Sequence, residues 1–153
     1  MTADPDARKR FDALMAGPSP ARREDLADLF GSLDAVTVPA MIGRWTGAPF
    51  PTGELWAFLL RQRAVARWQG KDFRSADRVH ALMVSVFGLT FAAPLGAAVL
   101  RADTFRGKQS TAMIYRWLPI VDHFRAVDPD TLMGAMEIRG RIRTWFGLRR
   151  ETG

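Results

Sequence analysis

The stretch Gly43-Arg44-Trp45-Thr46-Gly47 decides the fold of this chain. Its two glycines permit close backbone approach or a positive φ where a strand bends. Trp45 alternates with them along a β-strand, so its large apolar ring can plug one end of a closed sheet. We favour this architectural role for Trp45 over direct contact with a ligand. The first strand is predicted over residues 41–46.

The sequence around this stretch predicts helices first and strands later. Apolar residues recur at helical spacing early in the chain, and turn signals separate short strand-forming runs from residue 103 onward. Helices are expected at residues 11–16, 22–32 and 54–66, with a short one at 94–100. Strands are expected at residues 68–73 (with a turn), 104–106, 111–117, 120–127, 131–139 and 143–149. Residues 79–92 fit either a helix or a hairpin. The pattern favours an α+β fold, a small and mainly antiparallel β-barrel with two or three packed helices.

Length and composition limit the class of protein. The chain has 153 residues, of which 48% are hydrophobic and 25% charged, as expected for one globular domain. We expect a flexible segment with a short helix at 1–20 and the barrel domain at 21–153. The absence of cysteine excludes disulfides and thiol nucleophiles, and it favours the cytoplasm. No secretory signal is recognised, and glycine and proline interrupt residues 81–100, so no membrane span is expected.

A formal net charge of +6 raises nucleic acid as a partner. The arginines, however, are spread along the chain and mixed with acidic residues, and no binding motif accompanies them. Nucleic acid is therefore not the expected partner, and a homodimer is left open. The sequence also lacks a phosphate loop, a nucleophile elbow and a dinucleotide fingerprint. Gly70 and Gly107 are interpreted as isolated turn glycines.

Two blocks of residues together resemble a known family. The first block is Met41-Ile42-Gly43-Arg44-Trp45-Thr46-Gly47 with Pro51-Thr52-Gly53. The second runs from Ser110-Thr111-Ala112-Met113-Ile114-Tyr115 through Pro119-Ile120-Val121-Asp122-His123-Phe124-Arg125 to Asp128, Leu132-Met133-Gly134 and Arg139-Gly140. They resemble the GXWXG domain and the companion C-terminal domain of unknown function, over roughly residues 29–151. The resemblance implies a lipocalin-like β-barrel with helical additions, favours a hairpin over residues 82–92, and implies no activity.

The strand predicted over residues 120–127 carries the most informative polar residue. Alternation places Asp122 on one face with Phe124, a face that otherwise has the composition of a barrel interior. A carboxylate there must be paired or hydrogen-bonded, or its pKa rises. Asp122 is therefore either a general acid/base or half of a structural ion pair. The candidate partners in such a pair are Arg116, Arg125 and Arg139.

Three other residues complete the candidate chemistry. His123 lies on the face opposite Asp122 and is interpreted mainly as a hydrogen-bonded structural residue. Because the chain contains only two histidines, His80 and His123, a three-histidine metal site is impossible and no metal is expected. A haem would need only one axial histidine. Tyr115, the single tyrosine, shares a face with Thr111, Met113 and Trp117, a mixture typical of a binding pocket and also of an ordinary core.

The leading functional hypothesis is the binding of a small hydrophobic molecule inside the barrel, without a cofactor. The candidate lining residues are Trp45, Met113, Tyr115, Trp117, Asp122 and Phe124. One alternative is a cofactor-independent isomerase, cyclase or lyase in which Asp122 is the acid/base and Tyr115 or His123 assists. Another is a haem protein with His80 or His123 as the axial ligand.

Overall fold

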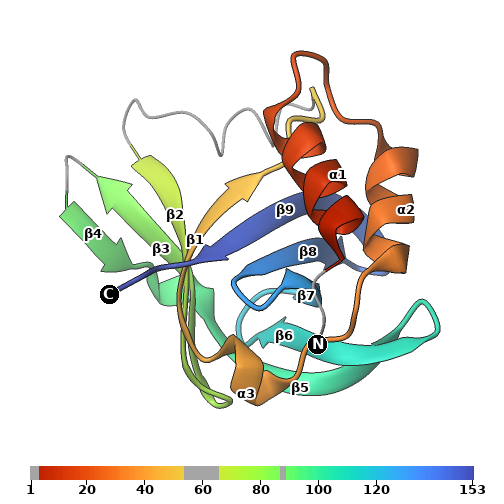
Figure 1. Ribbon diagram of the computed structural model, residues 1–153. Helices are drawn as coiled ribbons and strands as arrows, with labels where there is room; N and C mark the ends of the chain where they lie inside the picture. Colours follow the sequence, from red (N-terminus) through yellow and green to blue (C-terminus); the bar gives the residue numbers. More distant parts are fainter. Residues whose placement is uncertain (1–3, 54–65, 87–88) are drawn as a thin grey trace.

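The computed structural model describes residues 4–53, 66–86 and 89–153, and eight antiparallel strands in these ranges close into a barrel (Figure 1). Neighbouring strands follow the order β2-β1-β9-β8-β7-β6-β5-β3, and pairing of β2 with β3 closes the ring. A ninth strand, β4, forms a hairpin with β3. This architecture confirms the predicted α+β barrel. The strands are β1 (Gly43–Pro49), β2 (Ala66–Ser75), β3 (Arg78–Val86), β4 (Leu89–Ala92), β5 (Ala97–Phe105), β6 (Lys108–Tyr115), β7 (Ile120–Asp128), β8 (Thr131–Ile138) and β9 (Arg141–Arg150).

Helices cover one side of the barrel. Helix α1 (Pro5–Ala16) and helix α2 (Arg23–Ser32) lie side by side outside the sheet that contains β8 and β9 (Figure 1). Their apolar residues, including Phe11 and Phe30, form a second core with Trp145 on the outer face of that sheet. Strands there are buried on both faces, which explains the long buried run in β7. In the described part of the chain, no helix is long and apolar enough to span a membrane.

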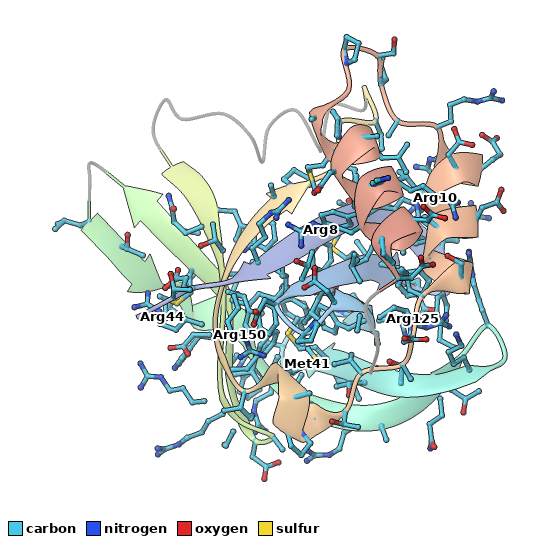
Figure 2. All side chains as sticks on the ribbon, in the orientation of Figure 1. Arg8, Arg10, Met41, Arg44, Arg125 and Arg150 are labelled. Carbon is cyan, nitrogen blue, oxygen red and sulfur yellow. The ribbon has the colours of Figure 1, made fainter. Side chains whose placement is uncertain are left out.

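The end of the barrel beside α3 (Val38–Met41) is filled by side chains. Trp45 is only 1% exposed there, and its indole nitrogen donates a hydrogen bond of 2.8 Å to the Met41 carbonyl. Met41 is the last residue of α3 (Figure 2), and Phe73 and Phe124 pack edge-to-face in the same core. Trp45 therefore has the architectural position expected of it.

Gly70 lies within β2 and is not the turn glycine that the sequence suggested. A Cβ atom on Gly70 would lie 1.8 Å from the Trp45 carbonyl oxygen, and its φ of +149° is one that other residues rarely adopt. Strand β1 can approach β2 this closely only because the side chain is absent. The pairing of β2 with β3 shifts register on both sides of Gly70, which marks a bulge.

Several predicted boundaries need correction. Helix α1 begins at Pro5, where the Asp4 carboxylate accepts from the Asp6 backbone N–H, so it is longer than predicted. The short helix predicted at 94–100 is wrong: a single 3₁₀ turn, η1 (Pro94–Gly96), leads into β5. Residues 79–92 form the β3–β4 hairpin on either side of the undescribed pair 87–88. The helix predicted at 54–66 falls almost entirely outside the described residues, and Ala66 begins β2.

Candidate functional site

The other end of the barrel contains a cavity of about 290 Å³. Strand β1 starts beside α3, so its last residue, Pro49, marks the end of the barrel away from α3. The cavity lies at that end, where it is lined by Pro49, by Ile120 at the start of β7 and by Ile138 at the end of β8. Its volume is close to the lower limit of typical ligand pockets. Most of the wall is apolar, and it includes Trp68, Leu82, Leu118, Ile120, Met136 and Phe146.

A buried ion pair interrupts this apolar wall. Lys71 Nζ lies 3.0 Å from Asp122 Oδ2, and the two side chains are 3% and 1% exposed. The same ammonium group donates to the Ala81 carbonyl at 3.3 Å and to the Tyr115 hydroxyl oxygen at 3.4 Å. An ammonium group has three hydrogens, so these three partners account for all of them.

Aromatic rings surround the Lys71 ammonium group. Its nitrogen lies 5.1 Å from the ring centre of Phe146, 5.3 Å from that of Trp68 and 5.7 Å from that of Tyr115. The faces of such rings carry negative potential, so they attract a cation at these distances. The Lys71 ammonium group thus has an aromatic and a carboxylate environment inside a barrel whose wall is mainly apolar.

The bulge at Gly70 explains how Lys71 reaches the interior. In a regular strand, Trp68 and Lys71 would point to opposite faces because the side-chain period is two. The register shifts around Gly70 insert an extra residue, and both side chains line the cavity. Strands β2 and β7 are four places apart in the ring of eight, so the Lys71–Asp122 pair joins opposite walls of the barrel.

Burial changes the acid–base behaviour of two cavity residues. It raises the pKa of Asp122 above its usual value, although the neighbouring Lys71 works in the opposite direction. It also raises the pKa of Tyr115 well above the usual value, with a further contribution from the Asp122 charge. Tyr115 therefore keeps its proton as a hydrogen-bond donor. The second carboxylate oxygen of Asp122, Oδ1, is buried and has no hydrogen-bond partner among the described residues.

The sequence-predicted lining residues separate into three groups. Tyr115 and Asp122 line the cavity together. Met113 and Phe124 are fully buried in the barrel core, as is Trp45 at the filled end, and none of them lines this cavity. Trp117 is 71% exposed. It lies two residues beyond the end of β6, so the alternation that grouped it with Tyr115 no longer applies, and its predicted place in the lining is wrong.

Neither histidine lines the cavity. His123 lies on the outer face of β7, where its ring stacks on Phe105 at 3.8 Å and its Nε2 lies 3.6 Å from Glu137 Oε1. Burial lowers the pKa of His123, while the Glu137 charge raises it by a smaller amount. His80 lines a separate surface pocket on β3. The haem alternative therefore has no axial histidine in the cavity. Among the described residues, no three or more side chains of the metal-binding acidic, histidine or cysteine types form a cluster.

Lys71, the partner of Asp122, is the site residue that the sequence did not predict. Arg125, one of three predicted partners, lies beneath α2 outside the barrel (Figure 2), where its guanidinium donates to the Phe30 and Phe105 carbonyls. Arg116 donates to the Asp77 carbonyl, and Arg139 occupies a turn with φ of 51°. A single lysine within the strand-forming run between Trp68 and Phe73 was the available signal.

Two family models and one solved structure match this chain. Residues 28–86 match the family model described as GXWXG protein, and residues 96–150 match a domain of unknown function (DUF4334). A solved structure, described as a crystal structure of a protein from Thermomonospora curvata, is 36% identical. The match covers 96% of this chain and 99% of that one, with a TM-score of 0.83. The chain belongs to the GXWXG family. In this GXWXG protein the motif supplies Trp45 at the filled end, while Asp122 and Tyr115 come from the DUF4334 region. No curated protein was found to match the sequence.

Proposed function

We propose that the barrel binds a small, mainly apolar molecule in the cavity between β2, β6, β7 and β8. The observation that carries this proposal is the combination of an apolar cavity of about 290 Å³ with one polar cluster, Lys71, Asp122 and Tyr115. Ligand pockets have this composition, because apolar walls supply affinity and a few polar groups fix orientation. The filled end beside Trp45 leaves the opposite end to receive the ligand.

Fluorobenzene, a compact apolar probe, tests this proposal by ¹⁹F NMR titration. We expect saturable binding, accompanied by methyl shifts at Leu82, Ile120 and Ile138, which line the cavity. Leu118→Trp and Met136→Trp each add volume to the wall and should weaken binding at least about tenfold, since overpacking leaves no room for the probe. Leu95→Trp is the matched control, because Leu95 is 56% exposed. Unchanged binding in both cavity variants would contradict the proposal.

A proton-transfer enzyme, namely a cofactor-independent isomerase, cyclase or lyase, is the second candidate. It is supported by Asp122, which lines the cavity together with Tyr115 and whose Oδ1 has no partner among the described residues. Asp122 would exchange a proton with the substrate, and Tyr115 would donate a hydrogen bond to the oxygen on which charge develops. His123, on the outer face, takes no part. An Asp122→Asn variant that retains ligand affinity and loses turnover would favour the enzyme; equal turnover in both proteins would exclude it.

A further inference from the structure

The polar cluster of Lys71, Asp122 and Tyr115 leaves one hydrogen-bond acceptor and one donor without partners among the described residues. All three hydrogens of the Lys71 ammonium group are accounted for by Asp122 Oδ2, the Ala81 carbonyl and the Tyr115 oxygen. Asp122 Oδ1 accepts no hydrogen bond from the described part of the chain, although its side chain is only 1% exposed. Tyr115 accepts from Lys71, and within the same residues its own hydroxyl donates to none. This cluster therefore offers one acceptor and one donor to a ligand.

The charge of the cluster is already balanced. Lys71 and Asp122 neutralise one another inside an otherwise apolar wall. A ligand carboxylate would be repelled by Asp122, and a ligand ammonium group would be repelled by Lys71. Either one would also bring an unpaired charge into a poorly solvated site, at a large cost in desolvation. The site thus favours a neutral molecule.

A hydroxyl is the simplest neutral group that satisfies both free atoms. It can donate to Asp122 Oδ1 and accept from the Tyr115 hydroxyl through the same oxygen. Both protein groups contact Lys71 Nζ, so a hydroxyl beside the ammonium group is within reach of each. A ketone or an ether could accept from Tyr115 but would leave the carboxylate oxygen unpaired, and a hydrocarbon would leave both unpaired. Buried groups without partners weaken binding.

We propose that the physiological ligand is a neutral, mainly apolar alcohol or phenol whose hydroxyl lies between Asp122 and Tyr115. The inference rests on the proposed function, because it specifies the ligand of the same cavity. The rest of such a ligand would pack against Trp68, Met136 and Phe146.

A series of probes with one six-membered ring tests the hydroxyl directly. Cyclohexanol, methoxycyclohexane, cyclohexanone, methylcyclohexane, cyclohexanecarboxylate and cyclohexylammonium are titrated into the full chain by calorimetry or by displacement of fluorobenzene. We expect cyclohexanol to bind about tenfold more tightly than the ether or the hydrocarbon, because only the alcohol can donate to Asp122 while accepting from Tyr115. The two charged probes should bind most weakly.

Tyr115→Phe provides the matched variant, since it removes the donor and keeps the aromatic ring and the Lys71–Asp122 pair. It should weaken cyclohexanol about fivefold to tenfold and change methylcyclohexane little. If methylcyclohexane or the ether binds wild type as tightly as cyclohexanol, the hydroxyl inference is wrong while cavity binding stands. If no probe binds, both proposals are wrong. Should the variant fail to fold, the wild-type series alone decides.

Discussion

Lys71 Nζ and Asp122 Oδ2 meet at 3.0 Å in the interior of the barrel, although their strands lie on opposite sides of it. Such a buried pair contributes little net stability, because the cost of desolvating two charges offsets their attraction. Apolar side chains of similar volume would fill the same space at least as favourably. The polar cluster is therefore better explained by what it presents to the cavity than by a contribution to folding.

Removing one member of this pair should destabilise the protein strongly. Lys71→Met leaves the Asp122 carboxylate buried without its cation, and we expect a loss of about 3–5 kcal/mol in the free energy of unfolding. Urea denaturation measures this loss. The double variant Lys71→Met with Asp122→Leu should recover most of it, since no buried charge remains. Additive losses in the double variant would show that the two side chains are not coupled.

Asp122 should make stability fall with rising pH. Burial raises the pKa of Asp122 in the folded chain above its ordinary value of 3.8. The folded chain then holds this proton more tightly than the unfolded chain, so the contribution is greatest below the unfolded pKa and is lost as pH rises through the folded one. The stability of wild type relative to Asp122→Asn should decrease as pH rises over the range above about pH 4, the ordinary carboxyl pKa. A difference that is constant across this range would contradict the raised pKa.

His123 should make stability fall as pH decreases, which is opposite to the effect of Asp122. Burial against Phe105 lowers the pKa of His123 from its ordinary value of 6.5, with Glu137 and Asp103 opposing the change. The unfolded chain takes up the proton first, so this contribution is complete above the unfolded pKa and is lost as pH falls through the folded one. His123→Phe retains an aromatic ring and cannot protonate. Wild type should therefore lose stability relative to this variant below about pH 6.5. Thermal denaturation of both proteins at several pH values measures the difference. If the two melting temperatures change with pH by the same amount, the prediction is wrong.

Alanine substitutions at two glycines should change the stability of the protein in opposite directions. Gly70→Ala forces a Cβ atom into the Trp45 carbonyl oxygen, so we expect a loss of at least about 3 kcal/mol or a failure to fold. Gly31 lies in α2, where an added Cβ atom would meet no described atom within 4 Å, and Gly31→Ala should stabilise by about 0.5–1 kcal/mol. Guanidinium denaturation of both variants checks the pair. A Gly70→Ala protein as stable as wild type would show that β1 and β2 can separate.

Trp117→Ala should leave cavity binding unchanged. The side chain is 71% exposed and follows the end of β6, so its loss should alter stability by less than about 0.5 kcal/mol. Titration with cyclohexanol compares this variant with Tyr115→Phe. A larger effect at Trp117 than at Tyr115 would mean that the cavity is not where the probe binds.

Much of the fold follows from local patterns in the sequence. The turn signals after residue 103 predicted five strands, and β5 to β9 are those strands with shifted boundaries. Alternation along residues 120–127 correctly placed Asp122 inside and His123 outside, because the pairing of β7 with β8 is regular from Ile120 to Ala126. Alternation failed at Trp117, where the strand has already ended. Alternation would also have misplaced Lys71 relative to Trp68, because a bulge at Gly70 changes the side-chain period.

The sequence by itself determined that the chain forms a mainly antiparallel barrel and that Asp122 faces its interior. The barrel follows from the strands and turns after residue 103, together with the resemblance of two blocks to the GXWXG family. The orientation of Asp122 needs only the alternation of neighbouring residues along one strand. The tertiary structure alone decided that Asp122 pairs with Lys71 and that one end of the barrel stays hollow. That pairing depends on the register shifts at Gly70 and on closure of the ring between β2 and β3. Both are set by contacts between distant strands, which no local pattern specifies.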